Sequence, residues 1–435
     1  MRVNSPRFLL TPSKAILFPS EWSLLFEALQ TESAARWAPP GGFVKQVTGA
    51  EEKLDELLGG DPIWFYAGYD PTADSLHCGH LLPIMIMAHL QRLGHKPIAV
   101  IGGGTAMVGD PSGKTEMRKM LSQEDIEANA KGIESQLKRY LSLDGEEGMA
   151  VNNADWLLGL GYVEFLREVG RYFRVNEMIK AESYAARLER EEGLSFIEFN
   201  YQLLQAYDFL KLHQEHRCLL QVGGDDQWSN ILAGLDLVRR IEGGEVQGLT
   251  IPLLTTAAGT KMGKTAQGAI WLDAKRTSPN EFFQYWRNVD DRDVERFLAL
   301  FTFLPMDEVR MLGSGEGAAL NEAKQRLAWE ATKLCHGEEE AEKAVKAQTQ
   351  VKGTLAESSI DPERLTEGIP VLDLFAELKL SPSKSEARRL VQGGGARING
   401  KVVEDLKTLV GDDHLEKGSI LLQAGKKRFH KLVVR

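Results

Sequence analysis

Two short segments far apart in the chain carry side chains suited to binding phosphate. His77-Cys78-Gly79-His80 directly precedes a segment with helical periodicity, and Lys261-Met262-Gly263-Lys264-Thr265 follows an apolar run. A helix N-terminus offers unpaired N–H groups and partial positive charge, so imidazoles placed there could contact phosphate oxygens. Two lysines among small residues could close over pyrophosphate as negative charge develops. Together the segments predict a nucleoside triphosphate site. Alone, the first is typical of a structural histidine pair and the second of an exposed turn.

The residues around the first segment predict a nucleotide-binding fold. Residues 63–69 form an apolar run typical of a buried strand, and residues 81–93 have helical periodicity with Pro83 in the first turn. Gly94 ends this helix, and residues 97–101 predict a second strand. A strand, a helix and a strand with short connections form a βαβ unit, so we expect a parallel sheet.

The rest of the chain divides where the pattern changes. We expect strands over 219–222 and 249–254, a helix over 228–241, and a helical insertion over 152–213. The predicted class is α/β, with the following parts: a poorly ordered N-terminal extension (1–41), a Rossmann-like catalytic domain (42–255), the lysine loop with a helical domain (256–347), a polar linker (348–369) and a small basic α+β domain (370–435).

Other kinds of site fail on spacing. The His-x-x-His pair lacks a third ligand of suitable spacing, so we predict no metal site. Three glycines at 102–104 follow a strand, but the last glycine of a dinucleotide fingerprint would fall on Met107. The first glycine of a phosphate loop ending in Gly113-Lys114 would fall on Val108. The sequence therefore supports neither of these nucleotide motifs.

One predicted helix, over 199–213, carries a polar stripe. Tyr201, Gln205 and Asp208 follow at intervals of four and three residues, which places them on one helix face. Such a stripe can form the polar wall of a pocket or the solvent-exposed face of an amphipathic helix. The pattern alone leaves both interpretations open.

Charge and composition limit the partners. The chain has 435 residues, a net charge of −10 and three scattered cysteines, which fits a reducing compartment. No apolar run reaches the roughly 18 residues of a membrane span.

Residues 381–435 carry 12 Lys and Arg against 6 Asp and Glu, so this part suits a polyanion, although a merely charged surface is the alternative. Arg2, Arg7 and Lys14 precede the first acid, which indicates a disordered start or, less favoured, an organellar transit peptide.

Five segments in one order resemble the bacterial-type tyrosyl-tRNA synthetases of class I. They are Tyr66–His77, Gly109–Lys114, Gln205–Phe209, Gly223–Trp228 and Lys261–Thr265. The resemblance runs from about Gly42 to the C-terminus. Cys78 departs from the usual isoleucine of the HIGH motif, and Gly263 and Thr265 depart from the serines of KMSKS. Both lysines are kept, so these departures do not put activity in doubt.

The resemblance implies activation of L-tyrosine by ATP and transfer of tyrosine to tRNA(Tyr). Tyr66 and Asp208 would hold the phenolic hydroxyl, and the remaining tyrosine contacts would come from Thr105, Asp110, Asn153, Tyr201 and Gln205. ATP would be bound by Gly68, Asp70, Gly79, Gly224, Asp226, Gln227 and Lys264. The departing phosphates would be stabilised by Thr72, His77, His80, Lys114, Arg118, Lys261, Lys264 and Thr265. Mg²⁺ would accompany ATP, with no tightly bound cofactor.

The resemblance also implies partners and a location. The tail would contact tRNA through Lys384, Arg388, Arg389 and Arg397. The insertion around 162–173 would form a homodimer interface, and the protein would work in the bacterial cytoplasm or, alternatively, an organelle, without a membrane. Two other functions stay open: a related enzyme that charges tryptophan, and an RNA-binding protein that keeps the fold without catalysis.

Overall fold

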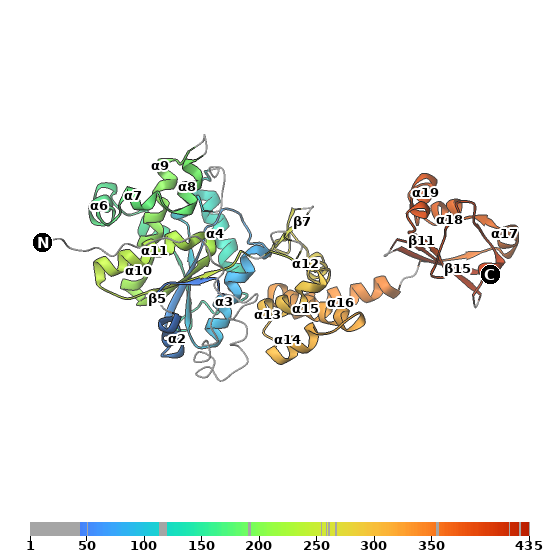
Figure 1. The fold of residues 1–435 in the computed structure, drawn as a ribbon, viewed down its shortest axis with the longest axis horizontal. Helices are drawn as coiled ribbons and strands as arrows, with labels where there is room; N and C mark the ends of the chain where they lie inside the picture. The colour runs from blue at the N-terminus through green and yellow to red at the C-terminus, as the bar shows by residue number, and fades with distance from the viewer. Residues whose placement is uncertain are drawn as a thin grey trace. The chain divides into compact units, whose positions relative to one another are not determined.

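The structure is a computed structural model that divides into two compact units, Met1–Glu342 and Lys343–Arg435 (Figure 1). It describes residues 44–49, 51–112, 120–189, 193–253, 255–257, 259, 262–265, 268–353, 356–416, 418–425 and 428–434. The predicted N-terminal extension lies outside the described residues.

A six-stranded sheet forms the centre of the first unit, in the order β1-β6-β5-β2-β3-β4. The strands are β1 (Gln46–Val47), β2 (Trp64–Tyr69), β3 (Lys96–Ile101), β4 (Met149–Asn152), β5 (Cys218–Gly224) and β6 (Gln247–Ile251). Strands β2 to β6 pair in parallel, as predicted, whereas the short edge strand β1 is antiparallel to β6. The sequence analysis did not predict β1 or β4. The α/β fold class is confirmed.

Helices cover this sheet because their buried faces are apolar. Helix α3 (Leu81–Arg92) connects β2 to β3 and is buried along nearly its whole length, since it also contacts the helical part of the unit through α13 (Val294–Phe301). The other helices next to the sheet strands are α2 (Glu51–Gly59), α4 (Gln123–Leu137), α10 (Tyr201–His216) and α11 (Trp228–Glu242). Helices α10 and α11 pack closely together (Figure 1).

The insertion after β4 consists of short helices, as predicted. They are α5 (Ala154–Leu157), α6 (Tyr162–Glu168), α7 (Val175–Met178), α8 (Glu182–Leu188) and α9 (Phe196–Phe199), followed by α10. Arg187 of α8 donates two hydrogen bonds to the carboxylate of Glu198 in α9, at 3.0 and 3.1 Å, and both side chains are buried. Because removing one partner would leave a buried charge, this pair specifies how α8 and α9 dock.

The helical part of the first unit follows a short hairpin, β7 (Lys264–Thr265) and β8 (Gly268–Ala269). Its core is aromatic: Trp286 packs against Phe282, Phe297 and Phe301 with ring centroids 4.9–6.1 Å apart. The helices besides α13 are α12 (Pro279–Arg287), α14 (Met306–Gly313) and α15 (Ala318–His336). Helix α16 (Glu338–Gly353) begins in the first unit and ends in the second.

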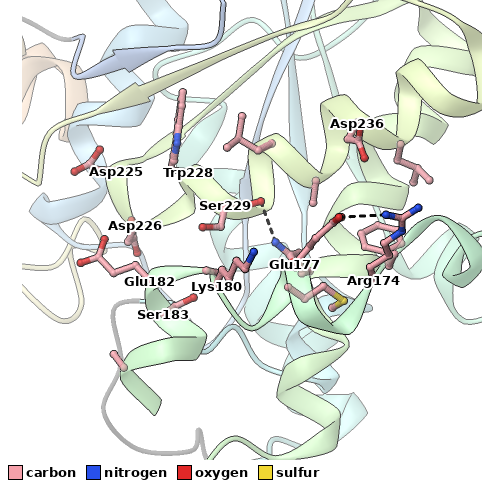
Figure 2. A pocket seen from close by; sticks show the side chains of 18 of the residues that line it. Arg174, Glu177, Lys180, Glu182, Ser183, Asp225, Asp226, Trp228, Ser229 and Asp236 are labelled. Atoms are coloured by element: carbon pink, nitrogen blue, oxygen red, sulfur yellow. Dashed lines mark hydrogen bonds and ion pairs between the residues drawn. The ribbon is translucent and has the colours of Figure 1, made fainter. Parts of the chain in front are cut away.

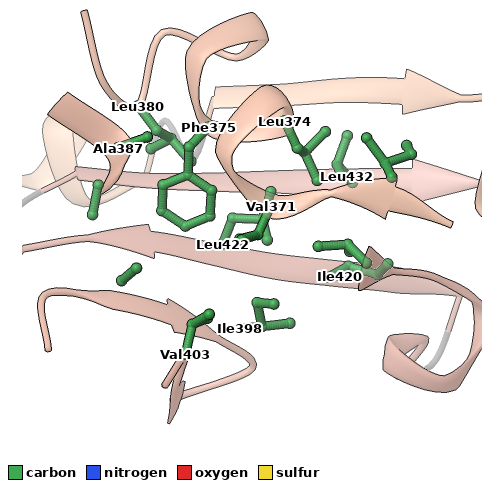
Figure 3. Packing of buried hydrophobic residues seen from close by; sticks show 14 of the residues in the cluster. Val371, Leu374, Phe375, Leu380, Ala387, Ile398, Val403, Ile420, Leu422 and Leu432 are labelled. Carbon is green, nitrogen blue, oxygen red and sulfur yellow. The ribbon is translucent and has the colours of Figure 1, made fainter. Parts of the chain in front are cut away.

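The second unit is built on a five-stranded sheet in the order β12-β11-β14-β15-β9. Buried Val371, Leu374 and Phe375 of α18 pack against strand residues such as Leu422 and Leu432 (Figure 3). The elements are β9 (Ala356–Ile360), α17 (Pro362–Glu367), β10 (Ile369–Pro370), α18 (Val371–Glu377), α19 (Lys384–Gln392), β11 (Ala396–Ile398), β12 (Lys401–Val402), β13 (Leu409–Val410), β14 (Ser419–Ala424) and β15 (Arg428–Val434).

The predicted linker over 348–369 is wrong. Residues up to Gly353 continue helix α16, and β9 pairs in parallel with β15 along its whole length. Ile360, Leu365 and Ile369 are buried in the core of the second unit. The polar composition of this stretch misled the sequence analysis, because β9 is an edge strand whose alternate residues face solvent.

We therefore expect a fragment covering residues 343–435 to unfold cooperatively. A fragment that begins at residue 370, the predicted domain start, lacks β9 and the buried Ile360 and Leu365, and should be largely unfolded. Circular dichroism during heating would measure this difference. Equal melting transitions for the two fragments would show that β9 and α17 are dispensable.

Candidate active site

The two signature segments lie against each other. Cys78 N–H donates to the carbonyl of Ile270 at 2.8 Å, and Leu272 N–H donates to the carbonyl of Leu76 at 2.8 Å. Gly263 has φ +79°, and a Cβ atom there would lie 2.9 Å from the backbone nitrogen of Gly79. Only glycine combines this conformation with this close approach. The departure from KMSKS at this position therefore has a steric reason.

The backbone holds the two histidine rings in place. Gly79 N–H donates to Nδ1 of His77 at 3.0 Å, and His77 N–H donates to Nδ1 of His80 at 3.2 Å. Their ring centroids lie 4.1 Å apart, and Trp271 approaches the His77 ring edge-on at 5.9 Å. Because each Nδ1 accepts, the neutral rings carry their proton on Nε2, the tautomer needed to donate to a phosphate oxygen.

Open space lies over the carboxyl end of β2. Gly68 sits in this central strand with β3 and β5 on its two sides, yet it is exposed, and a Cβ atom there would meet nothing within 4 Å. Strand β3, which follows β2 in the chain, lies on one side of β2, and the later strand β5 lies on its other side. Strand β2 is therefore the topological switch point, where open α/β sheets bind ligands.

Asp208 is buried at one side of this region, with 4% of its surface exposed. It accepts hydrogen bonds from Asn153 Nδ2 at 2.9 Å and Trp156 Nε1 at 2.8 Å. Burial raises the pKa of Asp208 to about 7, although these two donors act in the opposite direction. The Asp208 carboxyl group therefore titrates close to neutral pH.

Tyr66 of β2 places a second buried polar group close enough to Asp208 to feel its charge. Its hydroxyl is buried and finds no hydrogen-bond partner among the described residues. Burial raises its pKa well above the usual range, and the negative charge of Asp208 contributes to that shift. An unsatisfied buried hydroxyl costs free energy unless a ligand pairs with it.

The polar stripe on α10 faces this region rather than solvent. Tyr201 is buried, and its hydroxyl donates to Oδ2 of Asp70 at 2.8 Å, while Thr105 Oγ1 donates to Oδ1 of Asp70 at 2.7 Å. Gln205 accepts a hydrogen bond from Asn230 Nδ2 at 3.0 Å. The alternative of a solvent-exposed amphipathic face is therefore wrong.

Asp110 connects the glycine-rich loop after β3 to the start of α11. Its Oδ1 accepts from Ser112 N–H at 2.8 Å, and its Oδ2 accepts from Gln227 Nε2 at 2.8 Å. Burial raises the pKa of nearby Asp226, and the negative charge of Asp110 adds to that effect. The structure thus brings Asp70, Asp110 and Asp226 to one end of the sheet.

Sequence reasoning missed several groups that hold the site. Trp156, a direct partner of Asp208, belongs to no quoted motif, and Asn230 was seen only as part of a helix. A Cβ atom at Gly102 would overlap the carboxylate of Asp70, and one at Gly103 would overlap the Asn152 amide. These glycines therefore allow close packing of the site. Only their position after a strand signalled this role.

Part of the predicted site cannot be placed. Lys114, Arg118 and Lys261 lie outside the described residues, as do the side chains of Lys264 and Thr265, whose backbone forms β7. Thr72 is exposed just beyond Asp70, and Gly224 ends β5.

The predicted tRNA-binding residues all belong to the second unit. Lys384 pairs with Asp373 at 2.8 Å and Arg389 with Glu386 at 3.0 Å, whereas Arg388 and Arg397 are exposed.

A cavity of about 770 Å³ lies beside the start of α11 and is lined in part by Asp226, a predicted ATP-binding residue. Figure 2 shows Asp225, Asp226 and Trp228 in its wall, together with Lys180 and Glu182 from the insertion. Five of its lining residues are acidic and two are basic, so its field disfavours phosphate. Tyr66 and Asp208 do not line this cavity.

Among the residues that the structure describes, no cluster of three or more His, Cys, Asp and Glu could hold a metal ion. Within that part, no helix is long and apolar enough to cross a membrane.

Comparison with known proteins gives one consistent family. Residues 59–351 match the family described as tRNA synthetases class I (W and Y), and residues 357–432 match the tyrosine–tRNA ligase SYY-like C-terminal domain. The chain is 54% identical to the tyrosine–tRNA ligase of Clostridium beijerinckii over 91% of this chain and 97% of that protein. It is 52% identical to that of Desulfosudis oleivorans, again over 91% and 97%.

Solved structures agree with this result. A C-terminally truncated mitochondrial tyrosyl-tRNA synthetase from Aspergillus nidulans superimposes with a TM-score of 0.67 at 30% identity, covering 76% of this chain and 98% of that one. A tryptophanyl-tRNA synthetase from Encephalitozoon cuniculi has a TM-score of 0.54 at 14% identity over 75% and 94%, which shows a shared fold alone.

We expect Trp156→Phe to raise the pKa of Asp208 above its value of about 7, because it removes a donor that stabilises the carboxylate. Below the raised pKa more of the group is protonated, so the ionised fraction at pH 7–8 falls. Carboxyl ¹³C NMR of aspartate-labelled protein would follow the titration, with Asp208→Asn to assign the signal. Trp228→Phe, in the wall of the cavity beside α11, is the control. An unchanged titration would contradict the role of the indole.

Proposed function

The chain belongs to the tyrosine–tRNA ligases among the class I tRNA synthetases, and from this premise we propose that its buried pair Tyr66 and Asp208 selects the amino acid. The enzyme activates L-tyrosine with ATP, giving tyrosyl-adenylate and pyrophosphate, and then transfers tyrosine to the 3′ end of tRNA(Tyr). The roles of individual residues below are proposals supported by the geometry.

The observation that carries the proposal is the unsatisfied hydroxyl of Tyr66 close to Asp208. A phenolic hydroxyl of the substrate can donate to the carboxylate of Asp208 and accept from Tyr66, which satisfies both groups. Phenylalanine offers neither bond, so it would leave both polar groups buried without a ligand. The Asn153 amide donates a hydrogen bond to the Asp208 carboxylate and another to the Thr105 hydroxyl.

We assign the α-ammonium group to the other end of the stripe. Tyr201, Gln205 and Asp110 supply oxygen atoms there. Burial raises the pKa of Tyr201, and the negative charges of Asp70 and Asp110 are close enough to raise it further. The same charges favour a bound cation. The amino acid would thus be held at both ends. Its carboxylate would point toward the ATP site, which is the geometry that in-line attack on the α-phosphorus requires.

The ATP site is assigned to the switch point of the sheet. Open space at Gly68 suits the nucleotide, and we assign Asp226 to the ribose hydroxyls. The remaining nucleotide contacts are assigned to Asp70, Gly79, Gly224, Gln227 and Lys264. Mg²⁺ is proposed to enter with ATP.

No protein side chain needs to act as a nucleophile in this scheme, because the carboxylate of the substrate attacks. Catalysis then comes from positioning and from donors aimed at the developing phosphate charge. His77 and His80 are proposed as two of these donors through Nε2, with Thr72 beside them. The lysine segment is proposed to supply the rest, through Lys261, Lys264 and Thr265, together with Lys114 and Arg118.

We further propose that the protein is a homodimer. Leu158, Tyr162, Val163 and Leu166 expose apolar side chains on the insertion, as do several neighbours at Val175, Ile179, Leu188, Phe196 and Ile197. A concentration of exposed apolar side chains of this kind marks an interaction surface. The bacterial cytoplasm is the proposed location, supported by the identity with bacterial enzymes.

Asp208→Ala is expected to lower kcat/KM for tyrosine about 100-fold, since a charged buried hydrogen-bond partner is lost. Activity with phenylalanine should change little, so discrimination between the two amino acids collapses. ATP–pyrophosphate exchange with tyrosine, phenylalanine and tryptophan measures all three. Asp236→Ala, a carboxylate on the surface of α11, is the matched control. Retained preference for tyrosine in Asp208→Ala would contradict the assignment.

Val163→Asp should dissociate the dimer, because it places a charge on a side chain that is 76% exposed in the single chain and apolar. Light scattering after gel filtration should give twice the chain mass of 48.4 kDa for the parent and 48.4 kDa for the variant. Met311→Asp, an exposed apolar position on α14, is the control. A parent protein of 48.4 kDa would refute the dimer.

A further inference from the structure

Helix α12 carries a hydroxyl group that contacts the lysine segment. Tyr285 lies near the end of this helix, and its hydroxyl accepts a hydrogen bond from Gly263 N–H at 3.1 Å. Gly263 stands directly before Lys264, in the segment that also contains Lys261 and Thr265. A side chain of the helical part therefore reaches the middle of the lysine segment.

The helix that carries Tyr285 has a fixed position. It begins with a capping box, in which Ser278 Oγ accepts from Glu281 N–H at 3.3 Å and the Glu281 carboxylate accepts from Ser278 N–H at 3.0 Å. Trp286, the next residue after Tyr285, is completely buried in the aromatic core, and the two rings lie 5.4 Å apart. Because the helix is held at its start and along its buried face, the Tyr285 hydroxyl belongs to a rigid element.

The Gly263 peptide is held from two directions. Its N–H donates to Tyr285, and its carbonyl accepts from Ile270 N–H at 2.9 Å. A Cβ atom at this glycine would lie 2.9 Å from the Gly79 nitrogen, so the segment rests against the histidine motif. The preceding residue, Met262, is buried. Of these contacts, the one from Tyr285 is made by a hydroxyl that a substitution can remove without changing the main chain.

The same helical part also contacts the main chain before the lysine segment. Asp293 is buried and accepts from Ala257 N–H at 2.8 Å, and Arg296 donates to the carbonyl of Thr255 at 2.7 Å. These two contacts precede Lys261 in the sequence, and the hydroxyl contact described above follows it. The helical part thus holds the chain on both sides of the first lysine.

A lysine ammonium group stabilises developing phosphate charge only when it is well placed. A misplacement of about 1 Å can lower a rate on the order of 100-fold. Contacts that form only in the transition state change kcat rather than substrate affinity. Burial raises the pKa of Tyr285, so its hydroxyl stays neutral near pH 7 and can accept from an N–H group. This hydroxyl is therefore suited to orienting the segment.

We propose that Tyr285 is a positioning residue for tyrosyl-adenylate formation: its hydroxyl fixes the Gly263 peptide and thereby places Lys264 for the departing pyrophosphate. The proposal rests on the role proposed above for the lysine segment. It goes beyond that role by naming the group outside the segment through which the helical part acts on the reaction.

The test is single-turnover formation of tyrosyl-adenylate by the full-length protein, measured over a range of tyrosine and ATP concentrations with Mg²⁺. Tyr285→Phe keeps the ring and removes the hydroxyl. It should lower the rate constant at saturation about fivefold, the usual effect of one lost hydrogen bond. The concentrations of tyrosine and ATP that give half the maximal rate should stay unchanged, because the positioned lysine acts in the transition state.

Tyr184→Phe is the matched control, since its hydroxyl is likewise bonded to the main chain and donates to the Phe199 carbonyl at 3.1 Å. Both variants should lose a similar, small amount of thermal stability, and Tyr184→Phe should keep the rate constant of the parent. An equal fall in both rate constants would overturn the proposal, because loss of any buried hydrogen bond would then explain it.

A double-mutant cycle separates positioning from a general structural effect. If Tyr285 acts through Lys264, Tyr285→Phe should lower the rate constant by about twofold or less in a Lys264→Ala background. In a Trp156→Phe background, which alters the amino-acid site instead, the loss should remain about fivefold. Equal losses in the two backgrounds would contradict action through the lysine.

The single variants distinguish this proposal from the one beneath it. A parent-like rate constant for Lys264→Ala would overturn the role of the lysine segment itself. A parent-like rate constant for Tyr285→Phe, with Lys264→Ala impaired, would overturn the role of Tyr285 alone. So would a raised half-saturating concentration of tyrosine or ATP with an unchanged rate constant, which would assign Tyr285 to ground-state binding.

Discussion

Burial of the Asp208 carboxylate is the constraint on which the rest of the proposed amino-acid site depends. An ionised carboxylate away from water is costly unless donors surround it, and both donors come from outside its own helix. Asn153 follows β4 and Trp156 belongs to α5, so satisfying Asp208 fixes the insertion against α10. Burial raises the pKa of Asp208 and the two hydrogen-bond donors lower it, which leaves the pKa at about 7. The hydrogen bonds around Asp208 are therefore formed without a substrate.

Neutral donors also orient the two histidines of the proposed phosphate site. Backbone N–H groups select one tautomer for His77 and His80, so these rings need no carboxylate partner to orient them. The segment after the lysine loop pairs with residues 76–78 through main-chain hydrogen bonds, and Gly263 approaches Gly79 too closely for any side chain. The two motifs are thus joined by backbone, which tolerates changes such as Cys78 and Gly263 in their side chains.

The sequence was sufficient to predict elements whose apolar pattern is local and clear. Strands β2, β3 and β5, helix α3 and the stripe on α10 follow from periodicity and spacing, and the family resemblance named the pocket residues. Trp156 could not be found this way, because its role arises from a contact across 52 positions of the chain. The polar strand β9 was mistaken for a linker, since an edge strand shows little apolar alternation and only its pairing with β15 reveals it. The periodicity of apolar residues indicates which side chains are buried. It does not indicate which residues contact one another, because those contacts depend on tertiary structure.

The distribution of charge separates two kinds of recognition. The first unit holds buried carboxylates and an acidic cavity, surroundings that suit an ammonium group and repel a nucleic-acid backbone. Residues 381–435 carry the excess of basic groups. The proposed recognition of tyrosine therefore rests on short-range hydrogen bonds in a medium of low dielectric constant, where added salt has little influence. The proposed contacts with tRNA rest on exposed cations, whose charges are screened within about 8–10 Å at ordinary ionic strength. Salt should consequently weaken the transfer step far more than amino-acid activation, because only the transfer step requires the polyanion.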